Sequence, residues 1–245
     1  MNYELFRIFA HKLWKNKMKI GIIVAMDREL QQLRQVFDGS QVVVEKCGIG
    51  KVNAALGVQR MINEHRPDCI ISSGCAGGNG GGVNIKDIVV SREVAYHDVY
   101  CGAAEDGSLV YGQMQGMPAR FQADPYLLRK SEELRANHSQ LSIINSQLST
   151  LPSHLHSGLI VTGDWFVDSR EKMQSIIDLF PEALAVDMES AAIAHACYIN
   201  KVPFISFRVV SDMPLRDSHA SQYHDFWNQV ASQSFQLTRT FVESL

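Results

Sequence analysis

The stretch LAVDMESAAIAH, residues 184–195, passes from an apolar run directly into small helix-forming residues. The apolar run has the length of a buried strand, and the residues after it predict a helix. The junction between them consists of Asp187, Met188 and Glu189, so two carboxylates flank one thioether. A strand that leads almost without a loop into a helix is the repeating unit of an α/β fold.

The same alternation recurs along the whole chain. The apolar, β-branched runs are 19–25, 41–46, 69–73, 87–91, 158–162, 184–188 and 203–210. Helical patterns cover 27–37, 51–65, 169–180 and a C-terminal stretch from about Asp225. Several runs are continuously apolar, which is typical of strands that are covered on both faces. We therefore predict a single three-layer α/β/α domain around a central mixed, mostly parallel sheet.

Composition narrows the functional classes. The chain has 245 residues, of which 46% are hydrophobic and 20% charged, with a net charge of −3. It has no excess of basic residues that would favour binding to nucleic acid. No apolar run approaches the roughly 20 residues that are needed to span a bilayer. Its 5 cysteines form no CxxC motif. An odd number without regular spacing favours a reducing compartment, so we expect a cytoplasmic protein without a metal site.

Two segments fall outside the α/β pattern. Residues 1–17 mix apolar and basic residues at roughly helical spacing, and we assign them to an N-terminal extension ahead of a domain at 18–245. Residues 138–157 repeat SQLS at a seven-residue interval and contain Pro152, which predicts a surface insertion. Residues 101–123 are polar and rich in glycine, which predicts a loop.

Polar residues follow the predicted strands at the end where ligands bind in open α/β sheets. They are Asp27, Arg28 and Glu29, then the acids of GDWFVD, then Glu189, Ser211 and Asp212, with Arg208 just inside the last strand. Any one of these acids could simply cap a helix. Their occurrence after four strands favours a binding site at this edge.

The glycine run GCAGGNGGG, residues 74–82, also follows a predicted strand. It matches neither GxGxxG nor the P-loop pattern, and no helical pattern follows it directly. A phosphate cradle is therefore weakly supported. Close approach of the backbone to a flat ligand or a sugar is at least as consistent with the run, and a flexible loop remains an alternative.

Several separated stretches together resemble the 5′-methylthioadenosine/S-adenosylhomocysteine nucleosidases of the purine nucleoside phosphorylase superfamily. In chain order they are KIGIIVAMDREL, CGIGKVNAALG, SSGCAGG, DIVVSREVAYHD, PARFQAD, GLIVTGDWFVD, AVDMESAAIAH and VPFISFRVVSDMP. The resemblance implies hydrolysis of the N-glycosidic bond between adenine and a 5′-thio-substituted ribose, in 5′-methylthioadenosine and S-adenosylhomocysteine, with 5′-deoxyadenosine as a further candidate substrate.

The resemblance also implies roles for individual residues. Asp212 would protonate N7 of the departing adenine, with Ser211 orienting it. Glu29 would position and deprotonate the attacking water, and Arg208 would help to hold that water. Such a division between an acid and a base suits a leaving group that departs from an oxocarbenium-like sugar.

The substrate-binding residues implied by the resemblance are Met26, Ile49, Cys75, Ala76, Gly77, Phe166, Val167, Met188 and Glu189. Phe166 would stack on adenine and Val167 would bind it through its backbone. Glu189 would accept hydrogen bonds from the ribose diol, Met188 would lie against the sugar, and Asp187 would support the turn. The resemblance implies a homodimer, whose neighbouring subunit closes the pocket, and no cofactor or metal.

The chain departs from the family pattern in several places, of which two lie close to the predicted catalytic residues. The segment between Glu29 and Cys47 is shorter by roughly one hairpin, and Cys75 stands where these nucleosidases often carry serine. Ser72 and Glu29, at positions where related phosphorylases bind phosphate, favour water as the nucleophile. The alternatives are a futalosine-type nucleosidase, a phosphorylase, or a nucleoside-binding protein without catalysis.

Overall fold

The computed structural model describes residues 18–34, 37, 41–102, 109–144, 154–216, 222–223, 225–227 and 235–245. The predicted N-terminal extension, residues 1–17, lies outside the described residues. No helix among the described residues combines the length and the apolar character needed to cross a bilayer.

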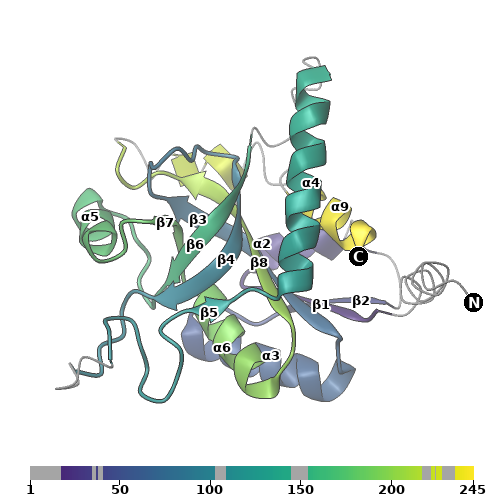
Figure 1. Cartoon of the computed structure of the whole chain (residues 1–245), viewed down its shortest axis with the longest axis horizontal. Coiled ribbons are helices and arrows are strands. Elements are labelled where there is room, and N and C mark those ends of the chain that lie inside the picture. The colour runs from purple at the N-terminus through teal and green to yellow at the C-terminus, as the bar shows by residue number, and fades with distance from the viewer. Residues whose placement is uncertain are drawn as a thin grey trace, which may run out of the picture.

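Eight strands belong to one sheet (Figure 1). They are β1 (Ile20–Val24), β2 (Val42–Lys46), β3 (Cys69–Gly78), β4 (Ile88–Tyr96), β5 (Phe121–Gln122), β6 (Leu155–Thr162), β7 (Ala183–Asp187) and β8 (Phe204–Asp212). The helices are α2 (Asp27–Arg34), α3 (Lys51–His65), α4 (Pro125–Ile144), α5 (Arg170–Leu179), α6 (Ser190–Asn200) and α9 (Gln236–Ser244). Strands and helices alternate through much of the chain, as the sequence predicts.

The strand pairings form a closed circuit, β3–β8–β4–β6–β7–β3. β1 and β2 extend the sheet from β3, and β5 adds to β4. Five pairings are parallel and three are antiparallel, so the predicted mixed, mostly parallel sheet is confirmed. The closure was not predicted, because it depends on the short antiparallel contact of Gly77 and Gly78 with β7.

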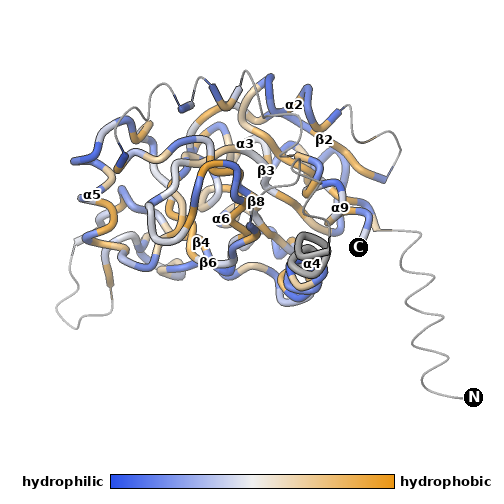
Figure 2. Tube along the Cα trace, turned by 90° about the horizontal axis from the view of Figure 1, so that it is seen from above, coloured by the Kyte–Doolittle hydropathy of each residue, from blue (hydrophilic) through white to orange (hydrophobic). Residues whose placement is uncertain are grey.

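Helices cover both faces of the sheet, which confirms the predicted three layers (Figure 1). α3 and α6 contribute to one buried apolar cluster, and α2, α4 and α9 contribute to a second on the other face. α5 packs on a third cluster through Met173 and Ile176, together with Phe180 directly after its end. The outer surface of α2 is largely hydrophilic (Figure 2), so only one stripe of this helix faces the core.

Several strands are longer than their apolar runs. β3 runs on to Gly78 and therefore includes the first five residues of the glycine run, beyond the apolar run 69–73. β8 includes Ser211 and Asp212. In both strands, pairing with a neighbour carries the extended backbone beyond the last apolar side chain.

Regular secondary structure enters the predicted surface insertion, 138–157, from both ends. α4 continues to Ile144, and β6 begins at Leu155, where it pairs with Ile88 of β4. The start of this strand was not predicted, because polar residues flank Leu155. Pairing with β4, rather than composition, sets the boundary. Residues 145–153 lie outside the described residues. The predicted loop at 101–123 is also interrupted, because β5 pairs with β4.

The packing of α3 against the end of β2 depends on Gly57. A Cβ atom at this position would overlap the Cβ of Cys47 and come within 3.1 Å of its Cα. Alanine in a helix interior is normally favoured over glycine by about 1 kcal/mol, whereas overpacking of a core costs about 1–3 kcal/mol. The contact with the backbone of Cys47 makes the cost of overpacking exceed the gain in helix propensity, because a backbone atom cannot rotate away.

We therefore expect Gly57→Ala to lower the free energy of unfolding by about 1 kcal/mol or more, measured by urea denaturation. Asn63→Ala, at an exposed position of the same helix, should change it by less than about 0.5 kcal/mol. Equal or greater stability of Gly57→Ala would show that α3 has room to move away from Cys47.

Candidate active site

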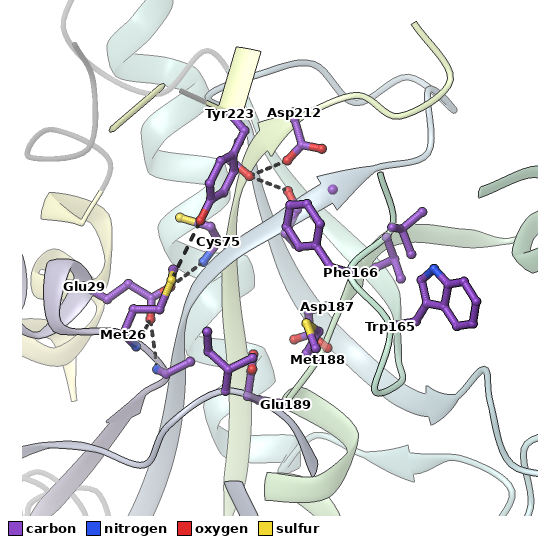
Figure 3. A pocket seen from close by; sticks show the side chains of 17 residues that line it. Met26, Glu29, Cys75, Trp165, Phe166, Asp187, Met188, Glu189, Asp212 and Tyr223 are labelled. Atoms are coloured by element: carbon purple, nitrogen blue, oxygen red, sulfur yellow. Dashed lines mark hydrogen bonds between the residues drawn. The ribbon is translucent and has the colours of Figure 1, made fainter. Parts of the chain in front are cut away.

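A cavity, partly open to solvent, lies at the carboxyl ends of several strands (Figure 3). The residues that line it are Ala25, Met26, Glu29, Ile49, Cys75, Ala76, Gly77, Trp165, Phe166, Val167, Val186, Asp187, Met188, Glu189, Ser211, Asp212 and Tyr223. Four of these residues are acids, and none is lysine, arginine or histidine.

Glu29 reaches the cavity from the first turn of α2. One carboxylate oxygen accepts hydrogen bonds from the backbone N–H groups of Ala25 and Met26, both at 2.9 Å, and the other accepts from the N–H of Cys75 at 3.0 Å. Burial raises the pKa of Glu29, while nearby Arg208 and the three N–H donors lower it. The carboxylate is therefore held rigidly, and its affinity for a proton is above the ordinary value.

Arg208 lies behind the cavity and does not line it. Its side chain is 1% exposed, and its Nε atom is 2.6 Å from Asp187 Oδ2 and 3.1 Å from Ser190 Oγ. The Nη2 atom donates to Ser72 Oγ at 2.8 Å and lies 3.8 Å from Glu189 Oε2. The buried charge is thus compensated by carboxylates and hydroxyls from β3, β7 and the start of α6.

Asp187 joins this cation to the strand–helix junction. Its carboxylate accepts hydrogen bonds from the Ser190 N–H at 3.2 Å and from Thr162 Oγ1 at 2.5 Å. The first of these bonds caps α6, so the turn-supporting role implied for Asp187 agrees with the geometry. Its ion pair with Arg208 is a further contact that the sequence did not indicate.

Glu189 is buried at the start of α6, where its Oε1 atom accepts a hydrogen bond from the Gly50 N–H at 3.0 Å. Burial raises the pKa of Glu189 to about 7, with Asp187 and Glu29 adding to the rise and Arg208 opposing it. A carboxylate in this setting keeps accepting capacity for a ligand hydroxyl, and loses its charge more easily than an exposed glutamate.

Asp212 lies at the end of β8, with its carboxyl group on the cavity wall. The hydroxyl of Ser211 donates to Asp212 Oδ1 at 2.7 Å, so it fixes the orientation of the carboxyl group. Asp212 and Glu29 face the cavity from different elements (Figure 3). Two separated carboxyl groups can act as an acid and a base on one bound ligand.

Cys75 lies beside Glu29, and burial together with that carboxylate raises the pKa of its thiol well above the ordinary value. The thiol therefore stays protonated and is a poor nucleophile. The preceding Gly74 is required by its neighbours, because a Cβ atom there would overlap Arg208 Nη1 and lie 2.7 Å from Glu29 Oε1.

The structure brings nearly all predicted site residues together. Twelve line the cavity: Met26, Glu29, Ile49, Cys75, Ala76, Gly77, Phe166, Val167, Met188, Glu189, Ser211 and Asp212. Arg208 is the exception, and the structure gives it direct contacts with side chains rather than a position on the cavity wall. Its carboxylate partners, Asp187 at the end of β7 and Glu189 directly before α6, hold the guanidinium in the layer behind the site.

Sequence reasoning missed Trp165 and Tyr223. Trp165 could have been found, because it adjoins Phe166 in the same strand-end segment. Tyr223 carried no such signal, since it follows a stretch without regular pattern. Its ring packs edge-on to Phe166, with centroids 5.7 Å apart, and its hydroxyl lies 3.8 Å from Met26 Sδ.

Among the described residues, one group of possible metal ligands lies close together, and it consists of Glu45, Glu64 and His65. These residues lie on β2 and at the C-terminal end of α3, and none of them lines the cavity. Glu45 already contacts His65 at 2.9 Å and Arg60 at 3.5 Å.

The sequence model of the Phosphorylase superfamily matches residues 35–243 of the chain. Solved 5′-methylthioadenosine/S-adenosylhomocysteine nucleosidases are similar over almost the whole chain. The Neisseria meningitidis enzyme, in complex with methylthio-immucillin-A, is 31% identical with a TM-score of 0.80, covering 94% of this chain and 100% of that chain.

Two further structures show the same similarity. The Streptococcus pneumoniae enzyme, with a transition-state inhibitor, is 32% identical with a TM-score of 0.78, covering 93% of this chain and 99% of that chain. The Colwellia psychrerythraea enzyme, in complex with adenine, is 32% identical with a TM-score of 0.79, covering 93% of this chain and 96% of that chain.

The raised pKa of Glu189 makes stability depend on pH. Because the folded-state pKa of about 7 exceeds the unfolded value, the stabilisation from protonated Glu189 is complete below about pH 4.3 and is lost as pH rises to 7. Glu189→Gln removes this titration and keeps an oxygen for the Gly50 N–H. We expect its free energy of unfolding, relative to wild type, to rise by on the order of 1–3 kcal/mol between pH 5 and pH 8.

Urea denaturation at both pH values, at one protein concentration, measures this change. Glu243→Gln serves as the control, because Glu243 is exposed and pairs only across one helix turn with Arg239. An unchanged pH dependence in Glu189→Gln would mean that Glu189 is charged in the folded protein throughout this range.

Proposed function

The chain belongs to the phosphorylase superfamily and, within it, to the 5′-methylthioadenosine/S-adenosylhomocysteine nucleosidases, and we propose on this basis that it hydrolyses 5′-methylthioadenosine and S-adenosylhomocysteine to adenine and the thio-sugar. The single observation that carries hydrolysis is the charge of the cavity wall. Four acids and no lysine, arginine or histidine line it among the described residues. Phosphate needs cationic or N–H partners, so this wall favours water over phosphate as the nucleophile.

In the proposed reaction, water attacks the anomeric carbon as the bond to adenine breaks. Asp212 gives its proton to N7 of the departing base, and Glu29 takes one from the water. The rise in the pKa of Glu29 through burial supports its role as the base, and the hydrogen bond from Ser211 supports the fixed orientation of Asp212. The enzyme then returns to its starting state by moving a proton from Glu29 to Asp212 through solvent.

The remaining residues would hold the substrate. Glu189 accepts hydrogen bonds from the ribose diol, Met188 covers the sugar, and Phe166 with Val167 forms the base pocket. Phe166 is 55% exposed beside the cavity, so its ring is accessible for stacking. Arg208 acts from behind, because its charge lowers the pKa of both Glu29 and Glu189.

The test incubates the protein with 5′-methylthioadenosine, with and without inorganic phosphate, and follows adenine and the sugar product. Free methylthioribose without phosphate is the expected result. Methylthioribose 1-phosphate formed only with phosphate would replace hydrolysis by phosphorolysis. Tight binding without turnover would indicate a nucleoside-binding protein, and turnover of futalosine in place of the thio-nucleosides would change the substrate.

We expect Asp212→Asn to lower kcat for adenine release by at least about 100-fold, because an amide cannot supply the N7 proton. KM should change little, since the amide keeps the size of the side chain. Asp27→Asn is the control, because Asp27 is 71% exposed at the start of α2 and pairs with Lys46. Near-normal turnover of Asp212→Asn would remove Asp212 from this role.

We further propose a homodimer in which a second copy covers the apolar surface beside the cavity. Ile49, Val52 and Leu56, at the start of α3, are 51%, 70% and 64% exposed. Tyr100 and Met114 add exposed apolar surface from the segment after β4. Apolar patches of this kind on a folded chain commonly mark an interface, and this one adjoins the cavity through Ile49.

We expect Leu56→Asp to convert a particle of twice 27.4 kDa into one of 27.4 kDa, because a buried interface cannot accept an unpaired carboxylate. Size-exclusion chromatography with light scattering measures the mass. Leu179→Asp makes the same change at an exposed position of α5 and should leave the dimer intact. A wild-type monomer would contradict the proposal.

We also propose a cytoplasmic location and one domain spanning 18–245, with 1–17 as an extension. All five cysteines are free, which supports a reducing compartment. The single strand circuit, to which every described strand is joined directly or through a neighbour, supports one folding unit.

A further inference from the structure

The N-terminus of α3 is capped by a residue from a distant segment. Its N-cap residue, Gly50, has no side chain that could accept a hydrogen bond from the first N–H groups of the helix, and the first turn contains no acid. Instead, the Lys51 N–H donates to Asp164 Oδ1 at 2.7 Å. Gly50 makes this approach possible, because its φ is 91° and a Cβ atom there would lie 2.9 Å from the same oxygen. Asp164 thus supplies the cap that the helix itself lacks.

A third residue closes the arrangement into a ring. Lys51 Nζ lies 2.8 Å and 2.7 Å from the two carboxylate oxygens of Asp98 and 3.8 Å from Asp164 Oδ2. Asp98 Oδ2 in turn accepts a hydrogen bond from the Asp164 N–H at 2.8 Å. The ring therefore joins the start of α3 to the segments that follow β4 and β6.

On two sides, this ring adjoins residues that line the cavity or contact its wall. On one side, Gly50 donates its N–H to Glu189 and follows Ile49, which lines the cavity. On the other side, Asp164 precedes the base-pocket residues Phe166 and Val167, which line it as well. The proposed sugar and base contacts thus come from two segments that Asp164 holds together.

We propose that Asp164 is a positioning residue that sets the spacing between the sugar and base contacts of one bound nucleoside. The inference rests on the proposed function for the identity of that ligand. A fixed spacing spares the substrate the cost of ordering the two segments on binding. Glu29 and Asp212, which carry the proposed proton transfers, come from α2 and β8, which are not part of the ring. The effect therefore falls on substrate binding more than on the chemical step.

The experiment compares Asp164→Ala and Asp164→Asn with wild type, using 5′-methylthioadenosine. Asp164→Ala removes the acceptor for the Lys51 N–H and should raise KM about tenfold, with kcat within about threefold. Asp164→Asn keeps a neutral acceptor and should recover part of this loss. Asp164→Ala with an unchanged KM, or with a loss confined to kcat, overturns the proposal.

Asp124→Ala is the matched control. Asp124 Oδ1 likewise accepts backbone N–H groups at a helix start, those of Tyr126 at 2.9 Å and Leu127 at 3.1 Å, but it belongs to α4 and does not line the cavity. It should lower stability without raising KM. If it raises KM as much as Asp164→Ala does, loss of stability explains both effects and the proposal fails.

Hydrogen exchange without substrate separates this inference from the proposed reaction. In Asp164→Ala, amides of both 48–53 and 163–168 should exchange faster, and in Asp124→Ala neither segment should change. Faster exchange in 163–168 alone would show that the two segments are not coupled and would overturn the proposal. This readout keeps its meaning if wild type does not hydrolyse 5′-methylthioadenosine, a result that would count against the proposed function alone.

Discussion

The buried guanidinium of Arg208 compensates the negative charge of the buried carboxylates around the site. Asp187, Glu189 and Glu29 are all buried, and carboxylates buried without a cation would take up protons or destabilise the fold. Arg208 compensates their negative charge, with a direct ion pair to Asp187 and a longer contact to Glu189. Because the pairs are buried, they are hardly screened by salt. The cavity can therefore be acidic on its wall and still belong to a stable protein.

This arrangement also explains features of the fold around it. Arg208 belongs to β8, so its ion pair with Asp187 of β7 and its hydrogen bond to Ser72 of β3 link members of the closed strand circuit, and a further hydrogen bond reaches Ser190 of α6. Gly74 leaves room on β3 for the guanidinium and for Glu29. The first glycine of the run after the third apolar stretch thus allows charged side chains to pack closely against the strand itself.

Apolar periodicity predicted the layers and the mixed sheet, because it reports burial. Strand ends predicted the edge at which Glu29, Glu189 and Asp212 line the cavity, and most of the other predicted wall residues came from the family resemblance. The sequence did not predict the closure of the sheet, which depends on two glycines whose neighbours only the fold determines. The polar start of β6 was missed for a related reason, since pairing with β4 outweighs local composition. Individual roles came from family resemblance, and the structure altered one expectation by placing Arg208 behind the cavity. Tyr223 carried no pattern that could have indicated its position.

The external cap on α3 has a consequence for how the chain folds. The hydrogen bond from Lys51 to Asp164 spans 113 residues, and that from Gly50 to Glu189 spans 139. Contacts of such sequence separation are slow to form, because closing a long loop carries a large entropy cost. During synthesis, the start of α3 stays uncapped until the segments after β6 and β7 have emerged. The binding edge is thus among the last parts to form, so a partly made chain has no substrate pocket.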